Sequence, residues 1–166
     1  MRPYRRRLPH CDAPGCAVFV TWRLRDSLPP ERSFEMAHLS SGRAFVTWDR
    51  LLDTARSGPM YLRQPDIAAL LRDQLWKVER CSIDAWVIMP NHVRVLWTPQ
   101  ASLSALVRKA KGPTAALTNR LMGRSGSFWQ DEYFDRILRN EQECRKVRQY
   151  IGCKPREVHL VQRKPG

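Results

Sequence analysis

Residues 86–97 read WVIMPNHVRVLW, and this segment constrains the fold more than any other part of the chain. Two apolar runs flank a Pro-Asn pair, which is typical of tight turns. Side chains alternate along an extended strand, so His92 and Arg94 lie on one face of the second run and the intervening valines on the other. The segment therefore predicts an antiparallel hairpin, with strands at about 83–89 and 92–98, that carries a histidine beside an arginine.

Patterns elsewhere in the chain predict further strands and helices. Alternating Val, Phe and Thr residues indicate a strand, and apolar residues three or four positions apart indicate helices. A Gly-Pro pair at 112–113 is expected to break or kink one helix. The segment from about 34 to 55 is ambiguous, although WDRLLDTA within it resembles a short helix. Besides the hairpin, the predicted elements are a strand at 17–25, helices at 64–80, 102–122 and from about 140 to 154, and a possible strand between 124 and 139.

This order of elements predicts an α+β fold in which helices cover one side of an antiparallel sheet. The layout is similar to that of a ferredoxin-like or RNA-recognition (RRM-like) fold. A chain of 166 residues is long enough for one domain with its own hydrophobic core. We expect a flexible basic arm at 1–15, a single domain over 16–161 and a short tail at 162–166.

The charge of the chain indicates the kind of partner. Lys and Arg number 29 against 16 Asp and Glu, which gives a net charge of +13 and favours a polyanion, with nucleic acid ahead of an anionic membrane. No apolar run is long enough to span a bilayer, and no secretion signal is visible, so a cytoplasmic location is expected. The five cysteines include no C-x-x-C pair, which argues against a disulfide framework and gives a zinc site only weak support.

The hairpin and the C-terminal part of the chain resemble a known family. MPNHVR is similar to the MPNHVH strand of the HUH-superfamily single-tyrosine transposases, particularly the REP-associated tyrosine transposases. GRSGSFWQDEYFDRILRN and the helix that follows it keep the order of the family's C-terminal motifs, and KAKGPTAALTNRL takes the place of its basic helix. The resemblance covers about residues 17–161 and implies the HUH form of the ferredoxin-like fold.

The resemblance also implies an activity. Members of this family bind single-stranded or hairpin DNA, as monomers or homodimers, and cleave and rejoin it in DNA transposition by tyrosine transesterification through a 5′-phosphotyrosine intermediate. A pair of histidines holds a divalent metal, Mg²⁺ or Mn²⁺, that polarises the phosphate. Tyr150 matches the nucleophile, with Tyr133 as the reserve candidate, and His92 matches the first metal ligand.

Two positions depart from the family pattern. Arg94 replaces the second histidine, and Lys154 replaces an asparagine that precedes proline in the family. A charged guanidinium or ammonium group cannot coordinate a cation and also repels it, so the usual metal site is expected to be absent or badly weakened. One consequence is a catalytically impaired, domesticated DNA-binding protein. The other is metal-free chemistry, in which Arg94 and Lys154 stabilise the charge of the phosphate.

The predicted helix at 102–122 carries the best candidates for contacts with the DNA backbone, which position DNA without reading its sequence. Trp129 is interpreted either as a core residue or as a stacking platform for an unpaired base. An RNA-binding protein also fits the charge and the layout, but the chain lacks the aromatic and glycine-rich strand signature of an RNA-recognition module. The candidate DNA-binding residues are Arg108, Lys109, Lys111, Arg120 and Trp129.

Overall fold

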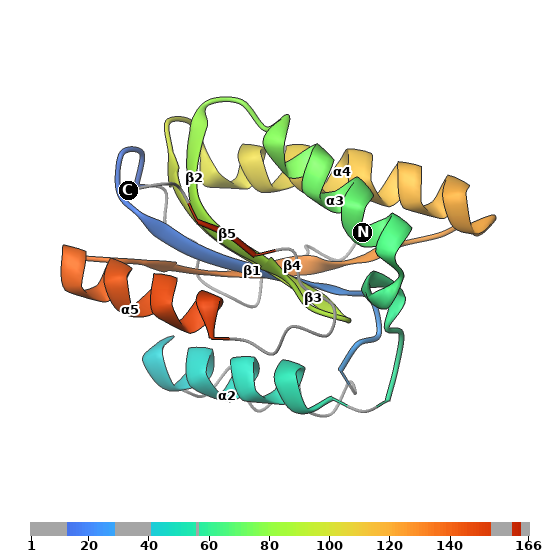
Figure 1. The fold of residues 1–166 in the computed structure, drawn as a ribbon, viewed down its shortest axis with the longest axis horizontal. Coiled ribbons are helices and arrows are strands. Elements are labelled where there is room, and N and C mark those ends of the chain that lie inside the picture. Colours follow the sequence, from blue (N-terminus) through green and yellow to red (C-terminus); the bar gives the residue numbers. More distant parts are fainter. Residues whose placement is uncertain (1–12, 29–40, 56, 154–160, 164–166) are drawn as a thin grey trace, which may run out of the picture.

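The computed structural model describes residues 13–28, 41–55, 57–153 and 161–163. Within this part of the chain, five strands form one antiparallel sheet in the order β4-β1-β3-β2-β5 (Figure 1). The strands are β1, Val18–Leu24; β2, Cys81–Ile88; β3, His92–Pro99; β4, Trp129–Ile137; and β5, Val161–Arg163. β3 is the central strand, so the residues it carries are enclosed by neighbours on both sides.

Helices lie on both faces of the sheet (Figure 1). α3, Pro65–Trp76, and α4, Leu103–Met122, cover one face, whereas α2, Ser41–Thr54, and α5, Glu141–Gly152, lie on the other. The predicted α+β class is confirmed, but the expectation that helices cover only one side is wrong. Every residue of β1 is buried, as is typical of a strand that is covered on both faces.

The predicted hairpin is confirmed as β2 and β3. Val87 lies opposite Arg94 in the antiparallel register, and the Met89 N–H donates to the carbonyl of His92 across the turn at 2.8 Å. His92 is the first residue of β3, so the turn places it directly at the start of the central strand. Alternation along β3 then directs His92 and Arg94 toward α2 and α5.

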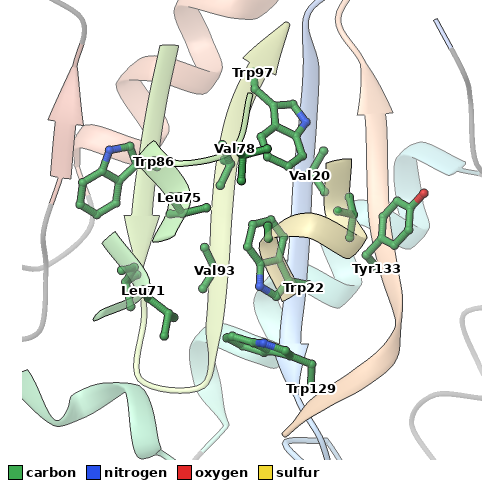
Figure 2. Close-up of a cluster of buried hydrophobic side chains, with 14 of the residues drawn as sticks. Val20, Trp22, Leu71, Leu75, Val78, Trp86, Val93, Trp97, Trp129 and Tyr133 are labelled. Carbon is green, nitrogen blue, oxygen red and sulfur yellow. The ribbon is translucent and has the colours of Figure 1, made fainter. Parts of the chain in front are cut away.

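The larger core lies between the sheet and helices α3 and α4 (Figure 2). Trp22 stacks on Trp97 with ring centroids 6.1 Å apart and meets the edge of Trp129 at 6.3 Å. α4 packs on this core and continues through Pro113, so the predicted break in this helix is wrong. Pro113 is on the exposed side of α4, where water can bond to the backbone carbonyl that lacks an amide partner.

The two ends of the chain differ from the predicted arm and tail. Residues 1–12 lie outside the described part of the chain, but the N–H of Gly15 donates to the carbonyl of Pro99 at 2.7 Å, so the end of the expected arm is attached to the sheet. Gln162 and Arg163 pair with β2 rather than belonging to a tail. None of the described helices is long and apolar enough to cross a membrane.

Candidate functional site

His92 and Arg94 lie between the sheet and the two helices α2 and α5. Both side chains are fully buried, because β3 is the central strand and this face is covered. Nδ1 of His92 lies 2.5 Å from Oδ1 of Asn91, and Nε2 of the same ring lies 3.7 Å from Oδ1 of Asp53. The contact with Asn91 fixes the orientation of the imidazole, which points its other nitrogen toward α2.

Two carboxylates of α2 bind the guanidinium of Arg94. Asp49 and Asp53 are one helical turn apart and therefore share a face of α2. Nη2 of Arg94 donates to Oδ1 of Asp53 at 2.9 Å and forms an ion pair with Asp49. Nε and Nη1 of Arg94 have no hydrogen-bond partner among the described residues. The buried cation is neutralised by α2, but within the described part of the chain only Nη2 of its three nitrogens is bonded.

α5 brings Tyr150 to the same place. The Tyr150 hydroxyl donates to Oδ2 of Asp49 and lies 3.4 Å from Oδ2 of Asp53. Its ring lies beside the guanidinium of Arg94, with Cζ 5.3 Å from the ring centroid. We call His92, Arg94, Tyr150, Asp49 and Asp53 the Arg94 cluster.

The sequence of α5 explains how Tyr150 is held in position. Asn140 caps the helix by accepting a hydrogen bond from the N–H of Glu143 at 2.9 Å. Arg148 then ties the helix to β2, because its Nε donates to Oδ2 of Asp84 at 2.7 Å. The hydrogen bond that Arg148 donates to Glu141 raises the pKa of the arginine further. These contacts fix both ends of α5 and thus the position of the tyrosine near its C-terminal end.

The Arg94 cluster does not fit a divalent ion. Mg²⁺ and Mn²⁺ need several oxygen or imidazole ligands that converge on one point. Asp49, Asp53 and His92 carry suitable atoms, but the guanidinium of Arg94 binds both carboxylates and repels a cation. Within the described ranges no group of three or more His, Cys, Asp or Glu residues could hold a metal. Arg94 supplies a fixed positive charge at this position instead.

A cavity of about 370 Å³ lies on the other face of the sheet, between α4 and β4. Arg108 and Lys111 of α4 line it, together with Phe128 and Gln130. The Lys111 ammonium donates to the carbonyl oxygens of Gln130 and Asp131, at 2.5 and 3.2 Å. Burial lowers the pKa of Lys111 to about 8, against the opposing charge of Asp131, so this lysine is still largely protonated at neutral pH. We call this space the α4 cavity.

Of the remaining candidate DNA-binding residues, Trp129 lines the α4 cavity, whereas Lys109 and Arg120 lie on α4 outside it. Lys109 and Arg120 are exposed on the same side of α4, roughly 16 Å apart along the helix axis. Trp129 lines the cavity but is only 5% exposed, and its Nε1 donates to Oγ1 of Thr114 at 2.9 Å, which makes it a part of the core (Figure 2). Lys154 lies outside the described residues.

The predicted site residues therefore fall into two groups on opposite faces of the sheet. The predicted catalytic pair and Arg94 meet in the Arg94 cluster, whereas the predicted DNA-binding residues lie on and around α4 (Figure 1). Sequence reasoning missed the roles of Asp49 and Asp53. The available signal was the acidic pair in WDRLLDTA, since a buried arginine needs a carboxylate partner.

A comparison with protein families assigns the chain to one of them. The family described as "Transposase IS200 like" matches residues 65–153, which is more than half of the chain. The chain belongs to this family. No protein of the curated set matches the sequence.

One solved structure shows the same fold. The structure of a REP-associated tyrosine transposase bound to a REP hairpin has 21% sequence identity and a TM-score of 0.55; the match covers 91% of this chain and 70% of that one. A second structure, from Deinococcus radiodurans, has 16% identity and a TM-score of 0.47, with 92% and 94% of the two chains covered. The first match shows that this chain has the fold of that transposase, and the family match makes the chain transposase-like. The second is too distant to carry an argument.

Proposed function

We propose that this chain binds single-stranded or hairpin DNA along α4 and does not efficiently cleave it. The exposed cations Arg108, Lys109 and Arg120 lie along this helix, and Lys111 borders the α4 cavity. Such cations bind DNA phosphates and release counterions, which supplies much of the affinity of a DNA-binding protein. The role fits the cytoplasmic location that the sequence leads us to expect.

The proposal that the chain does not efficiently cleave DNA rests on the ion pairs of Arg94. Tyr150 is at the position of the family's nucleophile, but the group beside it is a guanidinium bound to two carboxylates rather than a set of metal ligands. A phenol with a pKa near 10 is a poor nucleophile without a cation or a strong base to remove its proton. Metal-dependent transesterification is therefore not the activity that this geometry supports best.

A second candidate is metal-free transesterification, which the hydrogen bond from Tyr150 to Asp49 favours. In that reaction the phenolic proton passes to Asp49 while the tyrosine oxygen bonds to phosphorus. The bond from phosphorus to the 3′-oxygen breaks, and the leaving oxygen takes a proton from water while Asp49 returns the phenolic proton to the solvent, so that no net proton is gained or lost. Asp49 would act as the base and Arg94 would orient it, an arrangement found around activated nucleophiles. This candidate ranks second because an aspartate paired with arginine is a weak base.

The proposal predicts a preference among nucleic acids. A single-stranded DNA oligonucleotide with one hairpin, its fully duplex form and its RNA copy would be compared by fluorescence anisotropy at the same salt concentration. We expect the hairpin DNA to bind more tightly than the duplex and the RNA copy. Clear preference for the RNA copy would instead indicate an RNA-binding protein, and equal binding of all three would indicate nonspecific attraction of a basic surface.

A further inference from the structure

We propose that Arg94 is a binding site for a DNA phosphodiester, and that Asp49 and Asp53 occupy this site until DNA displaces them. The proposal deepens the DNA-binding function proposed above and rests on it. In the described structure α2 acts as an internal competitor for the phosphate, since its two carboxylates present the same kind of acceptor oxygens to the same donor.

The bonding of Arg94 is the first argument. Its side chain is fully buried, yet Nε and Nη1 lack hydrogen-bond partners among the described residues and only Nη2 contacts the carboxylates. Buried donors are normally satisfied, and unsatisfied ones mark positions of strain or function. The planar guanidinium presents a fork to two oxygens of one phosphate when Nη2, released by the carboxylates, pairs with either Nε or Nη1, the nitrogens without partners among the described residues.

The attachment of α2 is the second argument. Its described apolar contacts with the sheet run through a small cluster of Leu28, Leu52 and Phe134, which is separate from the two larger cores. By contrast, α5 is fixed through Ile151 in its own core and through the bond from Arg148 to Asp84. Among the described side chains, α2 therefore contributes fewer apolar residues to the packing on this face than α5 does.

The donors around Arg94 are the third argument. The Tyr150 hydroxyl donates to Asp49, and Nε2 of His92 points toward Asp53. All three side chains of the Arg94 cluster that come from β3 and α5 are thus directed at the carboxylates of α2. If α2 withdraws, the guanidinium of Arg94 and the hydroxyl of Tyr150 face the space that the carboxylates occupied and can donate to the oxygens of a phosphate there. His92 adds a donor only when its ring is protonated, because Nδ1 already donates to Asn91.

The test weakens the competitor without removing the counter-charge of Arg94. Asp53→Asn keeps the shape of the side chain and leaves Asp49 paired with Arg94, so the domain should remain folded, which circular dichroism checks. We expect this variant to bind a hairpin oligonucleotide roughly tenfold more tightly than the wild type, within the usual range of coupling between two sites. Asp73→Asn is the matched control, because it removes the same charge from the exposed surface of α3.

Whether the gain in affinity depends on Arg94 is tested by introducing Asp53→Asn into the Arg94→Met variant. If the phosphate binds Arg94, Asp53→Asn should give no gain in affinity in the Arg94→Met protein. A second measurement uses the wild type alone and does not depend on the folding of any variant. Hydrogen exchange of the α2 amides should become faster when the hairpin oligonucleotide binds, while the α4 amides should exchange more slowly.

The outcomes separate this inference from the proposed function. Binding that depends on the α4 cations, with Asp53→Asn equal to Asp73→Asn and α2 exchange unchanged, would overturn the phosphate site at Arg94 and leave the DNA-binding function standing. No binding of the oligonucleotide by the wild type or by any variant would overturn both.

Discussion

Arg94→Met is expected to lower the free energy of unfolding by about 3–5 kcal/mol. The substitution removes the positive charge between Asp49 and Asp53 but leaves the buried carboxylate of Asp49 under the covered face of the sheet. A carboxylate that is largely shielded from water and loses its counter-charge is strongly destabilising, whereas most single substitutions cost far less. Urea denaturation of the wild type and the variant, followed by circular dichroism, measures the difference.

A triple variant provides the internal control for this prediction. Combining Arg94→Met with Asp49→Asn and Asp53→Asn removes all three charges together, so most of the lost stability should return. If Arg94→Met alone stays within about 1 kcal/mol of the wild type, as ordinary surface substitutions do, the carboxylates do not bind Arg94 as described.

Removing three cations from α4 is expected to have the largest effect on DNA binding. The variant R108A/K109A/R120A should bind hairpin DNA roughly 30- to 100-fold more weakly at moderate salt. Each phosphate contact that the variant no longer makes reduces the number of counterions released on binding. The slope of log affinity against log salt should fall in magnitude by about 2–3, at 0.7 to 0.9 for each contact. Lys111 is kept in this variant, because its ammonium also bonds to the backbone of β4.

A matched variant separates a binding surface from a general effect of charge. R139A/R145A/K146A removes three exposed cations at and near α5, on the opposite face of the sheet from α4. We expect this variant to bind nearly as well as the wild type. Equal weakening by the two triple variants would mean that the net charge of the protein, rather than α4, determines its affinity.

The local part of the fold could be predicted from the sequence. The β2–β3 hairpin depends on a turn and on alternation within a dozen residues, so both were visible. The covering of the second face of the sheet by α2 could not be predicted, because α2 lies in a segment of ambiguous pattern. β5 is only three residues long and is held by pairing with β2 rather than by its own propensity.

The candidate site shows the same division. His92 and Arg94 share a strand, so their common face followed from spacing alone, and the placement of Tyr150 beside them followed from the family resemblance. Asp49 and Asp53 precede Arg94 by more than 40 positions, and only the folded chain brings them to it. The substitution of a histidine by arginine was visible in the sequence, but the two carboxylates that neutralise the arginine were not.

The continuation of α4 through its Gly-Pro pair also depends on tertiary structure. A Gly-Pro pair normally ends a helix, yet α4 continues because Ala110, Thr114 and Thr118 are buried against the sheet before and after it. The hydroxyl of Thr114 shows the same effect, since it both donates to the carbonyl of Ala110 at 2.8 Å and accepts from the indole of Trp129. Packing of this kind overrides local propensity.

The central claim is that Arg94, held by two carboxylates, stands in place of a metal site beside Tyr150. The most direct measurement is the formation of a covalent adduct between the protein and a labelled hairpin oligonucleotide, with Mn²⁺ or with EDTA, resolved on denaturing gels. We expect no adduct for the wild type under either condition, and an Mn²⁺-dependent adduct for R94H/K154N. An Mn²⁺-dependent adduct in the wild type that disappears in Tyr150→Phe would contradict the claim, whereas an EDTA-resistant one that disappears in Asp49→Asn would establish the metal-free reaction instead.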